Sequence, residues 1–159
     1  MIDSGARASG PQVASATALR IGVEENPATA DTDVILHGLR AFNEAHVGPT
    51  ERVSLGVLVR DADGRVLGGL TASVKFGWVH IDWLWLPDTL RGRGVGSAVM
   101  DAVEAEARRR GCVGAHVETT DYQALPFYEK RGYAVFGVLE GYPVGARSYY
   151  LRKELQGGE

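Results

Sequence analysis

Residues 84–100 read LWLPDTLRGRGVGSAVM, and this stretch decides the fold of the chain. An apolar strand leads into a short polar turn, a glycine-rich basic loop and then a helix that begins at about Gly94. Because glycine has no Cβ, a bulky anion can approach the backbone of this loop closely. The unpaired N–H groups of the first helical turn and the positive end of the helix dipole favour phosphate. Arg91 and Arg93 add cationic donors, so the stretch predicts an anion-binding loop.

The spacing of the glycines separates this loop from two better-known phosphate loops. A Rossmann fingerprint needs G-x-G-x-x-G or G-x-G-x-x-A, but the third position is Ser97 counted from Gly92 and Val99 counted from Gly94. A P-loop ends in Gly-Lys-Ser/Thr, and this loop contains no lysine. The remaining pattern is Arg-x-x-Gly-x-Gly at residues 91–96. If this pattern does not bind an anion, the loop is simply a flexible glycine turn on a basic surface.

A second motif lies about thirty residues downstream, where residues 124–133 read ALPFYEKRGY. Together the two motifs resemble the GNAT superfamily of acyl-CoA-dependent N-acyltransferases. The first is similar to the pyrophosphate loop of that family. The second is similar to a family segment in which an alanine precedes a Phe-Tyr-Glu-Lys-x-Gly-Phe/Tyr run. The resemblance covers roughly residues 78–155 and identifies the chain as a suspected GNAT acetyltransferase.

The resemblance implies an α/β (α+β) fold with a mixed, mostly antiparallel sheet, flanked by helices. One central parallel strand pair splays apart around acetyl-CoA, the implied cosubstrate, and no metal is implied. The pantetheine arm should pair with the strand before the loop, the pyrophosphate should lie in the loop, and the short helix of the second motif should flank the thiol end. The implied cofactor-binding residues are Leu84, Trp85, Leu86, Arg91, Gly92, Arg93, Gly94, Val95, Gly96, Ser97, Phe127 and Lys130.

Candidate catalytic residues lie on both sides of this cleft. Tyr128 matches the family position whose hydroxyl acts as general acid, and its alternative role is to pack a helix on the sheet. Asp82 is the first candidate for the general base, because an acidic group within an apolar strand is costly without a partner or purpose. His80 lies two residues before Asp82 on the same face of the strand, and Glu118 on the neighbouring strand is a further candidate. The alternative for Asp82 is a purely structural, hydrogen-bonding role.

The acceptor side of the cleft is less defined by the sequence. Many family members have asparagine where this chain has Asp121, and a carboxylate lacks the amide donor, so any contact made by that donor is in doubt. Aromatic residues can form a pocket for a flat or cationic amine, or can be ordinary packing. These aromatic residues are Trp83, Trp85, Tyr122, Tyr142, Tyr149 and Tyr150. The resemblance therefore implies transfer to a primary amine of a small molecule, such as an amino-acid derivative, a polyamine or an antibiotic. A non-catalytic acyl-CoA-binding module is the alternative.

The periodicity of apolar residues gives the order of the elements. Strands are expected at residues 19–23, 53–59, 65–76, 78–86, 112–119, 133–139 and 148–155, with a tight turn at Asp63-Gly64. Helices are expected from about Asp31 to Gly48 and over residues 94–110 and 124–131. Because a helix connects the strands 78–86 and 112–119, they should lie parallel. Residues 1–18 are interpreted as a flexible leader, and residues 19–159 as a single domain.

Composition excludes several classes of protein. The formal net charge of −3 provides no general attraction to nucleic acid or to an anionic membrane. A single cysteine, Cys112, rules out an internal disulfide, and its place at a strand start favours a buried apolar role over a nucleophilic one. Without a membrane-spanning stretch or a secretory signal, a cytoplasmic location is expected. Dimerisation through the C-terminal strands is implied by family analogy alone.

Overall fold

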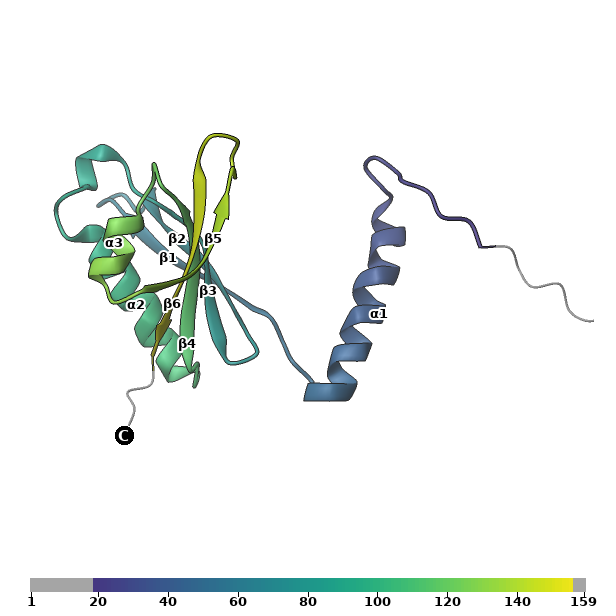
Figure 1. Cartoon of the computed structure of the whole chain (residues 1–159). Coiled ribbons are helices and arrows are strands. Elements are labelled where there is room, and N and C mark those ends of the chain that lie inside the picture. Colours follow the sequence, from purple (N-terminus) through teal and green to yellow (C-terminus); the bar gives the residue numbers. More distant parts are fainter. Residues whose placement is uncertain (1–18, 156–159) are drawn as a thin grey trace, which may run out of the picture. The chain divides into compact units, whose positions relative to one another are not determined.

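The computed structural model describes residues 19–155 (Figure 1). These residues divide into two compact units, one ending at Asn43 and the other beginning at Glu44. The first unit holds most of the helix α1 (Thr29–Val47), and the second holds a six-stranded sheet and the remaining helices. The candidate functional residues all belong to the second unit.

Helix α1 confirms the helix expected between Asp31 and Gly48. It begins two residues earlier, at Thr29, where the Thr29 carbonyl accepts a hydrogen bond from the Thr32 hydroxyl at 2.9 Å. Asp31 lies in the first turn, where a negative charge complements the helix dipole. Gly48 takes a φ of 79° and donates its N–H to the Glu44 carbonyl, which ends the helix as glycine typically does.

The prediction of a strand at residues 19–23 is wrong, because this segment has no regular secondary structure. Its alternation of apolar residues satisfies the periodicity of a strand, but a strand also needs a neighbour whose main chain completes its hydrogen bonds. All strands of the described sheet come from residues 53–154. The alternating pattern of these five residues does not determine whether another strand lies beside them.

The sheet has the strand order β1-β2-β3-β4-β6-β5. Its strands are β1 (Val53–Arg60), β2 (Val66–Lys75), β3 (Trp78–Trp85), β4 (Gly114–Thr120), β5 (Ala134–Glu140) and β6 (Arg147–Glu154). The pair β3–β4 is parallel, as the sequence predicted, and all other neighbouring pairs are antiparallel. This is the mixed, mostly antiparallel fold class that the family resemblance implied.

Two helices of the second unit, α2 (Val95–Arg109) and α3 (Leu125–Lys130), lie on the same side of the sheet in Figure 1. A single-turn 3₁₀ helix, η1 (Asp88–Leu90), precedes the loop that leads into α2. The core joins α2, α3 and the sheet through Ile81, Met100 and Tyr128. Cys112 is buried in the same core, in agreement with its expected role as a small apolar residue. No helix within residues 19–155 is long and apolar enough to span a membrane.

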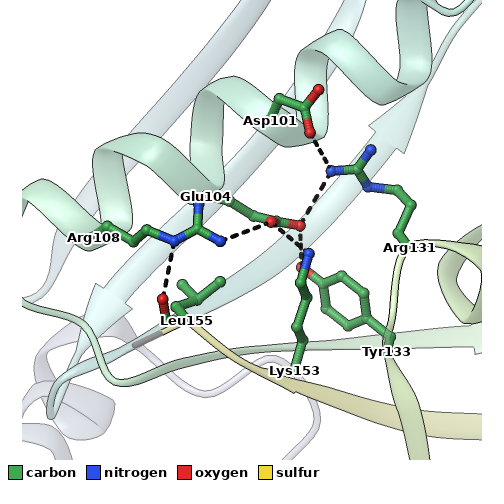
Figure 2. A network of polar contacts seen from close by, with 7 residues as sticks. All are labelled: Asp101, Glu104, Arg108, Arg131, Tyr133, Lys153 and Leu155. Atoms are coloured by element: carbon green, nitrogen blue, oxygen red, sulfur yellow. Dashed lines mark hydrogen bonds and ion pairs between the residues drawn. The ribbon is translucent and has the colours of Figure 1, made fainter. Parts of the chain in front are cut away.

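A buried carboxylate connects α2 to the C-terminal half of the sheet (Figure 2). The Glu104 side chain on α2 is only 3 % exposed, and its oxygens contact Lys153 Nζ at 2.7 Å and Arg131 and Arg108 at 3.3 and 3.4 Å. The Tyr133 hydroxyl donates to the same carboxylate at 3.3 Å. These partners come from α2, the end of α3, the start of β5 and β6, so one charged group fixes the positions of four elements relative to one another.

Candidate active site

The strands β3 and β4 separate halfway along their length and form a fork. Their parallel pairing runs from Trp78↔Gly114 to Ile81↔Val117 and then stops, although β3 continues to Trp85. Beyond the last pair, the inner edges of both strands carry main-chain N–H and C=O groups that an extended ligand can pair with. A cleft of about 700 Å³ opens at this fork.

The glycine-rich loop forms one end of the cleft. Gly92 and Gly94 have φ values of 68° and 78°, a region that residues with a Cβ rarely adopt. An added Cβ at either position would meet nothing within 4 Å, so the space above this backbone is open. Gly94 caps α2, whose first N–H groups point outward from the helix end. The loop therefore has the geometry of an anion site at a helix N-terminus.

Arg91 ties the loop to the end of the preceding strand. Its Nε donates to the Leu86 carbonyl at 2.9 Å, and its Nη1 pairs with Asp88 at 2.8 Å. Arg91 is also among the residues that line the cleft, so its positive charge lies near the loop end.

Most of the predicted cofactor residues meet in this one cleft. Those that line it are Leu84, Trp85, Leu86, Arg91, Gly92, Gly94, Gly96, Ser97 and Phe127. The other three predicted residues do not line the cleft. The Arg93 guanidinium donates to the Thr89 carbonyl, and Val95 packs against the core. Lys130 is exposed at the end of α3. The loop has the polar main chain and the open space that a long anionic ligand needs, and binding itself remains a prediction for every one of these residues.

Two carboxylates flank the point where the strands part. Asp82 directly follows Ile81, and Glu118 directly follows Val117, so each is the first residue beyond the last parallel pair. Both line the cleft. Asp82 contacts Nδ1 of His80 at 3.1 Å, which places the two side chains on one face as the sequence predicted.

The other carboxylate has an aromatic neighbour on β6. Tyr150 is paired with Glu118 in the register of β4 and β6. Desolvation and then the Glu118 carboxylate raise the pKa of the Tyr150 hydroxyl, which hydrogen-bonds to that carboxylate. A phenol is thereby kept protonated beside one wall of the cleft.

Tyr128 reaches the cleft from α3. Its side chain is 4 % exposed and packs edge-on against Phe127 and Tyr133, with ring centroids at 5.2 and 5.8 Å. Burial raises the pKa of the Tyr128 hydroxyl to about 12, because a phenolate would lose its hydration there. The hydroxyl is therefore a hydrogen-bond donor over the whole physiological range of pH.

Sequence reasoning missed two polar residues of the cleft, Thr119 and Gln123. Oγ1 of Thr119 accepts a hydrogen bond from the Ala124 N–H at 3.3 Å, and Oε1 of Gln123 accepts one from the Thr120 N–H at 3.1 Å. These bonds fix the turn between β4 and α3. Polar residues after a strand are common in any turn, so the sequence carried no signal that set these two apart.

Asp121 stands where many family members have asparagine, and its side chain is bonded to the main chain of Arg147. Its Oδ2 accepts a hydrogen bond from the Arg147 N–H at 3.2 Å, and its own N–H donates to the Arg147 carbonyl at 3.1 Å. The carboxylate thus joins the turn after β4 to the start of β6. Asp121 is not among the residues that line the cleft.

The fold and the site together define a class of protein: an α/β protein whose split sheet opens into a cleft lined by a glycine-rich loop at a helix N-terminus and by two carboxylates. The profile of the Acetyltransferase (GNAT) family matches residues 27–133, and the chain belongs to this family. It is therefore an acyltransferase.

Individual relatives agree with this assignment. An acetyltransferase of Agrobacterium fabrum is 34% identical over 115 residues, which cover 72% of this chain and 84% of the relative. The blasticidin-S acetyltransferase of Streptomyces morookaense is 43% identical over 93 residues, which cover 58% of this chain and 68% of the relative. A crystal structure of an acetyltransferase from Agrobacterium tumefaciens superimposes with a TM-score of 0.78 at 29% identity, covering 86% of this chain and 99% of that one.

Proposed function

We propose that the protein is an N-acetyltransferase that transfers the acetyl group of acetyl-CoA to a primary amine of a small molecule, by direct attack in a ternary complex. The observation that carries this proposal is the fork of β3 and β4, which places the glycine loop and two carboxylates along one cleft. In this proposal the loop residues 91–97 hold the pyrophosphate, and the open edge of β3 holds the extended arm. When bound, acetyl-CoA supplies the activated thioester.

The polarity of the cleft supports a cationic acceptor. Arg91 and the N-terminus of α2 make the loop end positive, whereas Asp82 and Glu118 make the fork negative. An anionic cosubstrate and an amine that is a cation in solution are attracted to opposite ends. The arrangement brings the two reactants together in a defined orientation, which lowers the barrier of a two-substrate reaction.

Exposed aromatic rings beside the fork support the same acceptor class. Trp83, Trp85 and Tyr122 line the cleft, with 77%, 60% and 66% of their surface exposed. Faces of such rings attract cations and flat ring systems. Because a relative at 43% identity acetylates blasticidin-S, an antibiotic bearing an amine is the first acceptor to test.

The protein groups divide the proton chemistry between them. Asp82 takes the proton that the attacking amine loses, and Glu118 attracts the acceptor to the fork. Tyr128 donates a hydrogen bond to the leaving sulfur. A thiol has a pKa of about 8.5, well below the value of about 12 for Tyr128, so this phenol stabilises the thiolate without giving up its proton.

A calorimetric titration tests the cosubstrate. Acetyl-CoA should bind saturably, and NADH and ATP should not. Gly94→Glu should weaken binding at least about tenfold, because it places a negative charge where the pyrophosphate lies. Gly64→Glu is the matched control, since Gly64 also has a positive φ and open space around it but lies in the β1–β2 hairpin. Equal binding by both variants would remove the loop from the cosubstrate site.

Release of the thiol of coenzyme A then tests the acceptor. Blasticidin S, a polyamine and an amino-acid amide are compared at saturating acetyl-CoA, and the acetylated product is identified by mass spectrometry. Thiol release that depends on one of these amines supports the proposal. Tight acetyl-CoA binding without thiol release across a broad panel of amines would favour the acyl-CoA-binding alternative.

A further inference from the structure

Asp82 is the extra residue of a β-bulge. In the antiparallel register of β2 and β3, Thr71 lies opposite Trp83 and Ala72 lies opposite Ile81, so Asp82 has no partner on β2. Bulges increase the local twist of a strand and redirect a side chain. This bulge lies at the last parallel pair of β3 and β4, so it turns the carboxylate at the point where the fork opens.

Three donors from separate segments reach one oxygen of this carboxylate. Oδ1 of Asp82 lies 3.1 Å from His80 Nδ1, 3.4 Å from Ser73 Oγ and 3.8 Å from the Arg52 guanidinium. The guanidinium also lies 3.1 Å from Ser73 Oγ. Because arginine can only donate, the Ser73 hydroxyl accepts from Arg52 and directs its own hydrogen to Asp82.

The second oxygen, Oδ2, is in a different situation. Within residues 19–155, none of the contacts of Asp82 involves Oδ2. The residue lines the cleft, while its donors His80, Ser73 and Arg52 line a separate hollow of about 600 Å³. The contacts from the hollow thus reach Oδ1, and the Asp82 side chain remains 25% exposed in a residue that lines the cleft.

The imidazole of His80 is itself fixed. Its ring stacks on His116 with centroids 4.4 Å apart and an interplanar angle of 16°. Burial and then the neighbouring His80 lower the pKa of His116, so His116 is neutral and does not compete for Asp82 as a cation. An ionised carboxylate only accepts, so the proton on His80 Nδ1 points at Oδ1. The remaining charged groups in this hollow are Lys75, Arg152 and Arg52.

We propose that His80 is the positioning residue for the base Asp82: its Nδ1–H holds Oδ1, so that Oδ2 faces the amine. This role rests on the proposed function. The amine first releases its ammonium proton to solvent; the neutral nitrogen then bonds to the thioester carbonyl carbon and passes a second proton to Oδ2 of Asp82. The carbon–sulfur bond then breaks, and the sulfur leaves as thiolate with a hydrogen bond from Tyr128. His80 is not the base itself, because it does not line the cleft.

Two substitutions separate the hydrogen bond of His80 from the packing of its ring. His80→Asn keeps an N–H donor close to the position of Nδ1 and loses the ring. His80→Phe keeps a ring that can stack on His116 and loses the donor. We expect His80→Phe to lower kcat about 10- to 100-fold, because a misplaced catalytic group has an effect of this size. We expect His80→Asn to keep at least about a third of wild-type kcat, and both variants to keep the KM for acetyl-CoA.

A double-mutant cycle with Asp82→Asn completes the test. If His80 acts through Asp82, His80→Phe should have no further effect on kcat once the base is removed. The reverse ranking, with His80→Asn impaired and His80→Phe active, would show that ring packing matters and would overturn the proposal. Wild-type kcat in both single variants would overturn it as well. These results differ from a failure of the proposed function, in which the wild-type protein itself releases no thiol with any amine.

Discussion

Two carboxylates of this protein, Glu104 and Asp82, both make ion pairs, but Glu104 is buried with its side chain 3% exposed, whereas Asp82 is 25% exposed and has fewer contacts. Both oxygens of Glu104 are in contact with cations or a hydroxyl, as Figure 2 shows. Within the described part of the chain, the hydrogen bonds and ion pairs of Asp82 are made through Oδ1, and the residue lines a cleft. A fully satisfied buried charge fixes elements in place, and changing it costs stability. A carboxylate at a cleft that has hydrogen-bond partners on one oxygen alone can still accept a proton from a ligand.

The largest expected effect is on turnover, from Asp82→Asn. An amide cannot accept the proton of the amine, so kcat should fall about 10²- to 10⁴-fold, the usual contribution of a general base. The KM for acetyl-CoA should change little, and the free energy of unfolding should change by no more than about 1 kcal/mol, because the asparagine side-chain oxygen can still accept the hydrogen bonds made to Oδ1 of this partly exposed group. Steady-state kinetics measure kcat and KM, and urea unfolding measures the free energy of unfolding. Glu118→Gln is the matched control, and a larger loss there would assign the base to Glu118.

The next effect is on stability, from Glu104→Gln. It leaves Arg131 and Lys153 beside a neutral group in a place with little access to water, and breaking a buried ion network in this way lowers the free energy of unfolding by about 3 kcal/mol. Urea unfolding measures the change. Glu106→Gln on the same helix is the control, because its partners Arg109 and Arg110 are at the surface, and its effect should be much smaller. Equal effects of the two variants would contradict the distinction between the sites.

The smallest effect concerns Tyr128, which is buried like Glu104 and lines the cleft like Asp82. Its pKa is raised from 10 to about 12, so the folded protein binds this proton more tightly than the unfolded chain does. The resulting stabilisation is complete below pH 10 and is lost as the pH rises towards 12, an effect of roughly 2–3 kcal/mol. Tyr128→Phe should lack this loss.

Urea unfolding of wild type and Tyr128→Phe between pH 9 and pH 11.5 measures the difference. The pKa of Tyr133 is also raised, by burial and then by Glu104; Tyr128 is the last of its causes, so most of the Tyr133 contribution is common to both proteins. Parallel pH dependences of the two proteins would mean that the hydroxyl of Tyr128 is hydrated, and its role as a protonated donor would need revision.

The sequence determined the parts of this protein that depend on local spacing. Alternating apolar residues placed β1, β2 and β3, and the glycine pattern placed the start of α2 at Gly94. The helix between β3 and β4 was sufficient to predict that these strands are parallel, because a crossover helix returns the chain to the end of the sheet where the first strand began. The two motifs were also sufficient for the family, since each is a short run whose chemistry needs its residues in that order.

The tertiary structure decided what depends on partners distant in the sequence. Residues 19–23 have the pattern of a strand and form none, because pattern does not supply a neighbouring edge. The fork between β3 and β4, the bulge at Asp82 and the contacts of its Oδ1 with Ser73 and Arg52 arise from the packing of segments that lie apart in the chain, whereas the contact with His80 is local to β3. A hydrogen bond depends on a distance and an angle in space, and the order of residues constrains these only after the chain has folded.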